Sequence, residues 1–276
     1  MSTPSLYPSL VGQTVLALHA HPDDEAIFTG ITLRRLADAG ARTVLVVATA
    51  GELGSSRVEL RRGESVPQRR VAELERAAEL LGVARLVLLG RRDSGLPGWS
   101  SGRHARALAT APILPLARSV AELADAEGAA TIVHDDENGI YGHPDHRVAH
   151  RVGATAAAMI GAVAYRTTVD RDRLDCHIQD SHTQPHLVHG AAGAARVSYG
   201  RPSAEITVSL AGSAAELDRK RAAILAHESQ VAPADVPAAG FAGAYGREWF
   251  SRTGAPGVID ELAAAAARPR EQITGA

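Results

Sequence analysis

Short runs of hydrophobic, largely β-branched residues alternate with longer segments of helical periodicity through the first half of the chain. The hydrophobic runs predict strands buried on both faces of a sheet, and they cover residues 14–20, 42–50, 85–90 and 130–135. Apolar residues recur at helical spacing between them, over residues 25–40, 71–82 and 115–128. Gly40 and Gly82 stand where the first two of these helices are expected to end.

This alternation of strand and helix predicts an α/β fold. Repeated βαβ units give a Rossmann-like three-layer arrangement, with a mainly parallel sheet and helices on both faces. The pattern predicts a helix to about residue 160 and then weakens. Later elements are expected as a strand over 205–210, a helix over 214–229, a turn-rich surface loop over 231–246 and a short alanine-rich helix before the end.

No internal repeat and no sharp change in composition divides the chain. We therefore expect one domain over residues 1–276, with a core of about 12–230 and a C-terminal loop and helix extension over 231–276. The 276 residues carry 29 Lys and Arg against 31 Asp and Glu, and this balance leaves no basic footprint for nucleic acid and no polybasic membrane patch.

The single cysteine, Cys176, excludes an internal disulfide framework and suits a reducing compartment. The first residues have neither a basic start nor an apolar stretch, so no signal peptide is predicted. The apolar runs fall short of a membrane helix. These features predict a cytoplasmic protein without a nucleic-acid or membrane partner, and they are compatible with a homo-oligomer.

Two polar clusters follow two of the predicted strands. The sequence HPDDE occupies residues 21–25, directly after the first strand, and HPDH occupies residues 143–146, after the strand that ends at residue 135. In parallel sheets, ligands bind at the carboxyl ends of the strands, so both clusters are expected at one edge. Each cluster alone also fits a helix start, with Asp23 or Asp24 as one cap and His143, before Pro144, as the other.

The two clusters together favour a metal site. His21, Asp24 and His146 supply two nitrogens and one oxygen, the kind of three-ligand set with which catalytic zinc leaves a position for water. Asp23 is then left over to act on that water. Ferrous iron fits the same ligands in a reducing cell. A non-haem iron oxygenase would also use this set, but it would give Asp23 no role.

Through these two clusters, the sequence resembles the LmbE/PIG-L family of zinc-dependent N-deacetylases, which includes GlcNAc-inositol deacetylases. The family motifs A-H-P-D-D-E and H-P-D-H correspond to residues 20–25 and 143–146. The resemblance continues through residues 49–54, 70–82, 92–96 and 226–230, so it covers most of residues 15–230. It implies His21, Asp24 and His146 as metal ligands and Asp23 as the general base.

The resemblance also implies residues that hold the substrate. His143 corresponds to a cationic partner for the oxyanion, oriented by Asp145 and with Tyr141 beside it. Arg70 and Asp93 correspond to residues that hold sugar hydroxyls. We also expect Glu52 to line the pocket. Ser229 and Gln230 match a family motif near the end of the core, whose role the residues do not reveal.

The implied reaction is metal-dependent hydrolysis of the N-acetyl amide of an N-acetylated amino sugar or its conjugate, which releases acetate and a free amine. An amidase that acts on a mycothiol-type conjugate, and a non-catalytic sugar- or metal-binding relative, remain open alternatives. Phe28 is bulky where the mycothiol enzymes of the family carry a smaller or charged side chain, which argues against a mycothiol substrate. The loops at 97–112 and 231–250 are expected to set specificity.

Several other residues have two interpretations. His19 shares a strand face with His21, and a hydrogen-bonded core histidine is favoured over a role at the site. The four histidines within residues 177–189 are interpreted as solvated loop residues and not as a second metal site. The aromatic residues of the two specificity loops could stack on a sugar ring or pack against the body, and they are Trp99, Tyr245, Trp249 and Phe250.

Overall fold

The structure is a computed structural model that describes residues 7–181, 186–195 and 198–266. Seven strands form one sheet in the order β3-β2-β1-β4-β5-β7-β6. The strands are β1 (Thr14–His19), β2 (Arg42–Thr49), β3 (Arg85–Arg91), β4 (Ala129–Asp135), β5 (Val163–Thr168), β6 (Val208–Ala211) and β7 (Arg247–Arg252). Strands β1 to β5 are parallel to one another, whereas β7 is antiparallel to β5 and β6. The predicted α/β class with a mainly parallel sheet is confirmed.

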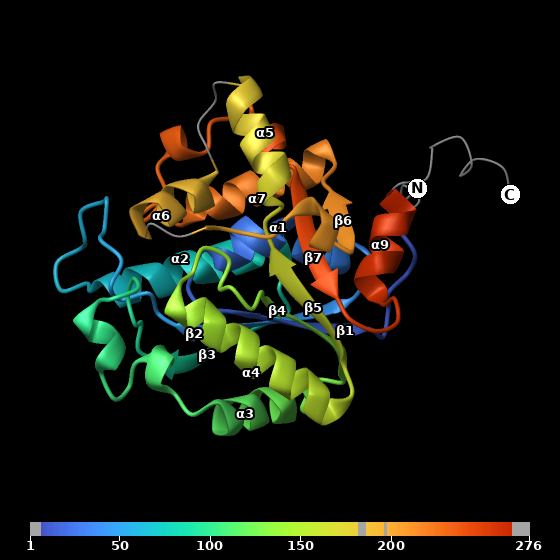
Figure 1. The fold of residues 1–276 in the computed structure, drawn as a ribbon, viewed down its shortest axis with the longest axis horizontal. Coiled ribbons are helices and arrows are strands. Elements are labelled where there is room, and N and C mark those ends of the chain that lie inside the picture. Colours follow the sequence, from blue (N-terminus) through green and yellow to red (C-terminus); the bar gives the residue numbers. More distant parts are fainter. Residues whose placement is uncertain (1–6, 182–185, 196–197, 267–276) are drawn as a thin grey trace, which may run out of the picture.

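Helices cover both faces of this sheet, as Figure 1 shows, with α3 and α4 on one side and α1, α2 and α7 on the other. The helices are α1 (Asp24–Asp38), α2 (Val66–Leu81), α3 (Ile113–Ala126), α4 (Pro144–Ile160), α5 (Arg171–Ser181), α6 (Leu187–Ala195), α7 (Ala214–Ala226), α8 (Phe241–Tyr245) and α9 (Val258–Ala266). Within the ranges described, no helix combines the length and the hydrophobicity that crossing a membrane requires.

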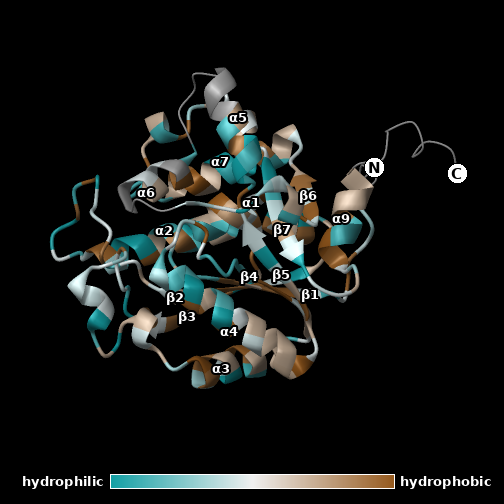
Figure 2. Cartoon of the chain, in the orientation of Figure 1, coloured by the Kyte–Doolittle hydropathy of each residue, from teal (hydrophilic) through white to brown (hydrophobic). Residues whose placement is uncertain are grey.

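Two hydrophobic cores lie between these layers. Every residue of β1 is buried, and so is every residue of β2 except Arg42, because both faces of these central strands are covered by helices. Figure 2 shows the hydrophobic colour along the central strands of the sheet. One core packs the sheet against α1, α2 and α7, and the other packs it against α3 and α4. An unbroken hydrophobic run in this sequence therefore indicates a strand that is covered on both faces of the sheet.

The structure corrects the prediction in four places. The run at 85–90 forms the edge strand β3, which is only half-buried, with Leu88 40% exposed. The sequence pattern missed β5 and β7, whose charged and polar positions interrupt the hydrophobic runs. The strand expected over 205–210 begins only at Val208. The turn-rich segment 231–246 contains α8, which buries Phe241 and Tyr245 and so is not a free surface loop.

The strand order brings the two polar clusters together. Because β1 lies between β2 and β4, the direction of winding reverses at β1, and such a reversal opens a crevice at the carboxyl ends of the strands. The segment after β1 carries His21 to Glu25, and the segment after β4 leads to His143 and α4. Parallel pairing of β1 with β4, in the register Leu18 to His134, sets these two segments beside each other.

Candidate active site

Asp23 occupies a strained position at the start of α1. Its backbone is left-handed, with φ of 103°, a conformation that residues other than glycine rarely adopt. Its backbone N–H donates to Glu25 Oε2 at 2.9 Å, and Arg70 Nη2 donates to its carboxylate Oδ2 at 3.0 Å. Arg70 also donates to the backbone oxygens of Pro22 and Gly51. These bonds hold the Asp23 carboxylate at the cavity.

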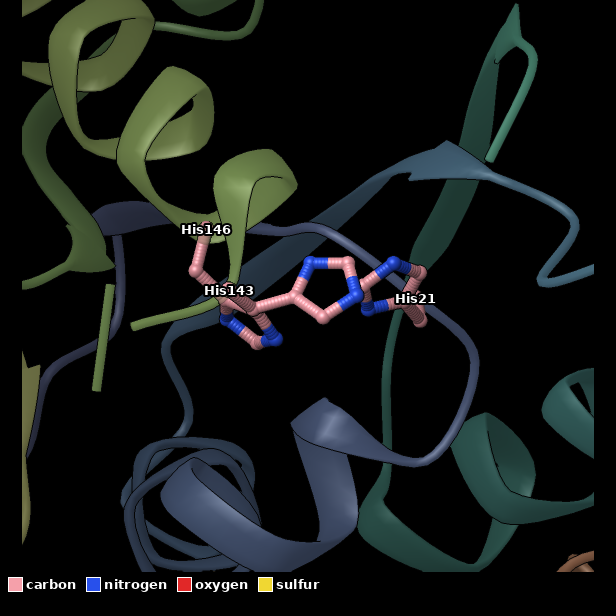
Figure 3. Close-up of side chains that lie close together, drawn as sticks. All are labelled: His21, His143 and His146. Atoms are coloured by element: carbon pink, nitrogen blue, oxygen red, sulfur yellow. The ribbon is translucent and has the colours of Figure 1, made fainter. Parts of the chain in front are cut away.

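The three expected metal ligands converge beside Asp23. Asp24 Oδ2 lies 3.5 Å from His21 Nδ1, and Asp24 Oδ1 lies 3.6 Å from His146 Nε2. Bonds of the length that zinc makes to nitrogen and oxygen place neighbouring tetrahedral ligands about 3.4 Å apart. Figure 3 shows the rings of His21 and His146 turned toward a common space, with His143 beside them. The Asp24 carboxylate therefore lies at ligand spacing from each of the two imidazoles.

The hydrogen bonding of His146 supports this fit. Its Nε2 atom is buried and has no hydrogen-bond partner in the described part of the chain, which is costly for a polar atom. Its other nitrogen, Nδ1, lies 2.8 Å from Asp135 Oδ2. A carboxylate on the far nitrogen is the usual support of a metal-ligating histidine, since it fixes the tautomer and the ring orientation. The free Nε2 and the two neighbouring ligands together fit a divalent metal such as zinc or ferrous iron.

His143 offers a rival ligand, because nitrogens of His21, His143 and His146 all lie within 4.8 Å of one another. Its Nδ1 atom, however, accepts the backbone N–H of Asp145 at 3.2 Å as the cap of α4. The ring proton of a neutral His143 must then sit on Nε2, so that atom is a donor and not a free ligand. Asp24, which has one oxygen near each of the two imidazoles, is the candidate third ligand.

The environment of His143 differs from the cationic partner expected from the sequence. Burial and the neighbouring His21 and His146 lower the pKa of His143 to about 2, so the ring is neutral. Asp145 does not orient it through its carboxylate, either. That carboxylate lies 3.3 Å from His21 Nε2 and accepts hydrogen bonds from the backbone N–H and hydroxyl of Ser94. Only the Asp145 backbone reaches His143, because the side chain points back toward the loop after β3.

A second cluster of possible ligand atoms consists of His21, Asp93 and Asp145, again within 4.8 Å. The Asp93 oxygens accept the backbone N–H groups of Leu53 and Gly95 at 3.3 and 2.8 Å. Asp145 is likewise occupied by Ser94. Since these carboxylates already bind donors, the cluster fits a role in holding His21 in place better than it fits a second metal.

The pKa values of the two neighbouring acids of the site, Asp23 and Asp24, are shifted in opposite directions. Burial, together with the nearby Asp24, raises the pKa of Asp23 to about 6, although Arg70 opposes that shift. Burial also disfavours the charged form of Asp24, but His146 and His21 outweigh it and hold the pKa of Asp24 well below its usual range. The pKa of Tyr141 is raised well above its usual value by burial and nearby carboxylates, so its hydroxyl keeps its proton. One carboxylate is thus suited to move protons and its neighbour to bind a cation.

Asp23 and Tyr141, together with His21 and His143, line a cavity of about 370 Å³, the site cavity. Its lining residues come from seven separated segments of the chain: His21, Asp23, Leu53, Gly54, Ser55, Arg70, Asp93, Gly95, Leu96, Trp99, Tyr141, His143, Ala191 and Gln230. Trp99 is 48% exposed at the rim, and a side chain at Gly95 would collide with its ring. Trp99 is thus the aromatic residue available to a ligand, whereas Tyr245, Trp249 and Phe250 are buried in the body.

The expected substrate-binding residues are distributed unequally. Asp93 and Arg70 line the site cavity, although Arg70 already donates to three oxygens around the Asp23 segment. Glu52 lines a neighbouring cavity and reaches the site only through Oε1, which accepts the backbone N–H of Asp93 at 3.1 Å. Glu52 therefore supports Asp93 from behind.

Sequence reasoning missed two buried carboxylates that support the site. Asp135, the last residue of β4, lies 2.8 Å from His146 Nδ1 and 3.1 Å from His19 Nδ1. Glu25 lies 2.7 Å from His227 Nε2, while its second oxygen accepts the Asp23 N–H. The sequence does place Asp135 at the end of a predicted strand and His227 within the family motif at 226–230. It does not show which residues they contact, because those contacts depend on the fold.

The remaining predictions have mixed outcomes. His19 is a buried core histidine bonded to Asp135 and Thr29, as expected. His186 is buried and stacked on Tyr245, so the solvated interpretation is wrong for it; His182 and the side chains of His177 and His189 lie outside the described residues. Ser229 binds Glu73 through both its backbone N–H and its hydroxyl, which is a structural role.

Comparison with known proteins gives one family. The family model described as PIG-L, GlcNAc-PI de-N-acetylase, matches residues 16–157. A 1D-myo-inositol 2-acetamido-2-deoxy-α-D-glucopyranoside deacetylase from Thermomonospora curvata is 35% identical over 243 residues, which cover 79% of this chain and 80% of that protein. The N,N'-diacetylchitobiose deacetylase from Pyrococcus horikoshii shares the fold, with a TM-score of 0.55, 21% identity and coverage of 87% of this chain and 84% of its own.

A second similar structure has another chemistry in its name. The 4-carboxy-2-hydroxymuconate hydratase from Pseudomonas putida matches with a TM-score of 0.54 and 15% identity, over 89% of this chain and 98% of its own. A shared fold at this level of identity carries no assignment of activity. The function must therefore be argued from the side chains at the site.

Proposed function

This chain belongs to the PIG-L family, and from that premise we propose that it is a metal-dependent N-deacetylase that hydrolyses the N-acetyl amide of an amino sugar or an amino-sugar conjugate. The observation that carries the proposal is the unpartnered, buried His146 Nε2 atom, which faces Asp24 and lies beside His21 next to the Asp23 carboxylate. This arrangement supports a cation and a free base side by side. Zinc is our first choice of metal, and ferrous iron fits the same ligands.

Asp23 is proposed to move the protons of the reaction. When bound, a divalent metal at His21, Asp24 and His146 supplies Lewis acidity that acidifies water and polarises an amide carbonyl. The Asp23 carboxylate removes a proton from the attacking water and returns one to the leaving amine. Its pKa, raised by burial to about 6, suits both steps near neutral pH. Arg70 keeps the carboxylate aimed at the cavity through the 3.0 Å contact.

His143 is proposed to stabilise negative charge on the former carbonyl oxygen. Hydrolysis of an amide passes through a tetrahedral species with an oxyanion, and fixed donors at that oxygen lower the barrier. The cap hydrogen bond from Asp145 N–H to Nδ1 leaves the Nε2–H of His143 as a donor that lines the site cavity. The protonated Tyr141 hydroxyl lines the same cavity and supplies a second donor. The role proposed here is that of a neutral donor, and no charge on His143 is needed.

The sugar is proposed to lie between Asp93 and the Trp99 ring. Aromatic faces commonly stack on the apolar face of a sugar, and a half-exposed ring at the cavity rim is placed for that contact. Phe28 gives no reason to exclude a mycothiol precursor. It is buried, does not line the site cavity, and packs edge-on against the His146 ring at a centroid distance of 6.2 Å.

The decisive experiment measures acetate release by metal-loaded protein. The panel should include N-acetylglucosamine, N,N'-diacetylchitobiose and the N-acetylglucosaminyl-inositol that the Thermomonospora relative is named for. We expect acetate and free amine in equal amounts from at least one member, and loss of both when the metal is removed by a chelator. Failure to release acetate from any member by fully loaded protein would overturn the proposal. Binding of a sugar without turnover would favour a non-catalytic relative.

A mycothiol-type conjugate should be tested in parallel. An amidase would release the carboxylic acid of the conjugate's own amide and leave acetyl groups in place, so the identity of the released acid separates the two reactions. We expect acetate to be the acid that appears.

A further inference from the structure

A second cavity of about 290 Å³ lies behind the site, and we refer to it as the arginine cavity. It is formed by the edge strand β3, the start of α2 at Pro67 and the loop that follows β3. Its lining residues are Thr49, Ala50, Glu52, Pro67, Leu88, Gly90, Arg91, Arg92, His104 and Arg106. Three arginines and a histidine therefore line one cavity, together with a single acidic residue.

The arginines of this cavity have no acidic partners. In the part of the chain that the structure describes, none of Arg91, Arg92 and Arg106 has a carboxylate oxygen within 4 Å. The Nε atoms of Arg91 and Arg92 are shielded from solvent and lack any hydrogen-bond partner there. Arg85, at the other end of the same strand, differs because it pairs with Glu127. Unpaired guanidinium groups repel one another, so an anion between them would be bound favourably.

Glu52 separates the two cavities and does not neutralise the arginines. One of its carboxylate oxygens accepts the Asp93 backbone N–H, and within the described residues Glu52 forms no ion pair. Leu53, the next residue, lines the site cavity, as does Asp93, the residue after Arg92. Segments 52–53 and 92–93 are thus a wall with the reaction site on one side and the arginine cavity on the other.

We propose that the arginine cavity is a binding site for an oxyanion of the phosphate class. Guanidinium groups match the oxygens of phosphate with paired hydrogen bonds, and charge-assisted bonds of this kind are the strong ones. The anion has two potential sources, a phosphate group carried by the amino-sugar conjugate or free phosphate from solution. The first source rests on the proposed deacetylase function, whereas the site itself does not.

The binding test uses inorganic phosphate and metal-loaded protein in a calorimetric titration, with chloride holding the ionic strength constant. The test variant is Arg91→Gln with Arg106→Gln. The matched control is Arg103→Gln with Arg118→Gln, which removes the same charge from two exposed arginines outside the cavity. We expect saturable binding by the wild type and the control, and binding about tenfold or more weaker in the test variant.

Three results would overturn the site. One is the absence of saturable phosphate binding by the wild type. Another is equal binding by the wild type and the test variant, which would place the anion elsewhere, for example at the proposed metal ligands. Equal weakening in the test and control variants would also contradict it, because the effect would then follow net charge and not the cavity.

The source of the anion is separated by comparing kcat/KM for N-acetylglucosamine 1-phosphate and N-acetylglucosamine. If the substrate carries the anion, the test variant lowers the ratio of these two values by about tenfold, and the control variant does not. An unchanged ratio with weakened phosphate binding identifies free phosphate as the source. If neither these sugars nor any member of the acetate-release panel is hydrolysed while phosphate still binds through the arginines, the proposed deacetylase function fails and the anion site stands.

Discussion

Two buried carboxylates support the site from opposite sides, and they act on different groups. Asp135, at the end of β4, lies against Nδ1 of both His19 and His146, and so holds a proposed metal ligand. Glu25, in the first turn of α1, bridges His227 to the backbone N–H of Asp23, and so holds the proposed base. Asp135, Glu25 and the imidazoles they contact are all fully buried.

The difference lies in what each carboxylate fixes. Asp135 acts on a side chain, and it sets the direction and tautomer of the His146 ring. Glu25 acts on the main chain, and it stabilises a left-handed residue that would otherwise be strained. The two supports should therefore separate in experiment, one changing metal affinity and the other changing turnover. The predictions below test that separation.

The largest effect is expected from removing the ligand that Asp135 supports. His146→Ala should lose bound metal and reduce acetate release to background, because two ligands hold a catalytic cation poorly. The measurement is elemental analysis after dialysis, together with activity. His150→Ala, one turn along α4 and outside the site cavity, is the control. Full metal content in His146→Ala would remove His146 from the ligand set.

Substitution of Asp23, the proposed base, should give the next largest loss of activity, without loss of bound metal. Asp23→Asn keeps the shape of the side chain but cannot accept a proton, so kcat should fall about 10²- to 10⁴-fold at unchanged metal content. Single-turnover rates and elemental analysis check both halves of this prediction. Near-native turnover by Asp23→Asn would show that another group moves the protons.

Substitution at the first support should weaken the metal without abolishing it. Asp135→Asn leaves an amide that cannot accept from both His19 and His146, so the His146 ring loses its fixed tautomer. Metal affinity should fall about 10- to 100-fold. Competition with a chelator of known affinity measures the change. Recovery of wild-type kcat at saturating metal would confirm that Asp135 acts through the ligand, whereas an unchanged affinity would contradict the comparison.

Substitution at the second support should lower turnover and spare the metal. His227→Ala removes the partner of Glu25, so the Asp23 segment can relax, and we expect kcat to fall about tenfold with little change in KM. His227→Gln restores a donor to Glu25 and should recover most of the loss. His186→Gln, another buried histidine, controls for a general loss of stability. A fall in metal affinity in His227→Ala would contradict the comparison, because both supports would then act on the metal.

The smallest effect concerns a buried imidazole without a carboxylate. His134 Nδ1 lies 2.8 Å from the backbone oxygen of Asp135, its ring packs against His150, and burial lowers its pKa to about 4. The unfolded chain takes up this proton near pH 6.5, so the stability linked to neutral His134 is present above that pH and is lost as pH falls toward 4.

The test of this effect compares the wild type with His134→Asn. Over the interval from pH 6.5 to 4 the linked loss amounts to at most about 3 kcal/mol. Urea unfolding at about pH 7 and about pH 4.5 should show a smaller decline in the variant. An equal decline in both proteins would show that the acid sensitivity arises at other groups.

Local sequence patterns predicted much of the fold and of the candidate site. Unbroken hydrophobic runs marked β1, β2 and β4, since a strand covered on both faces needs apolar residues at every position. The motifs at 21–25 and 143–146 identified the residues that converge on the site, because their chemical types and their place after two parallel strands were visible in one dimension. The sequence pattern did not predict strands β5 and β7, because polar and charged positions interrupt their hydrophobic runs.

Only the tertiary structure decided which groups support which. The partners of Asp135 and Glu25 lie 116 and 202 residues away in the chain, at His19 and His227, and no local pattern encodes contacts across such distances. The same holds for the neutral state of His143, which depends on burial and on two neighbouring imidazoles from other segments. Sequence determines which side chains are available, whereas desolvation and hydrogen bonding depend on where the folded chain sets them beside one another.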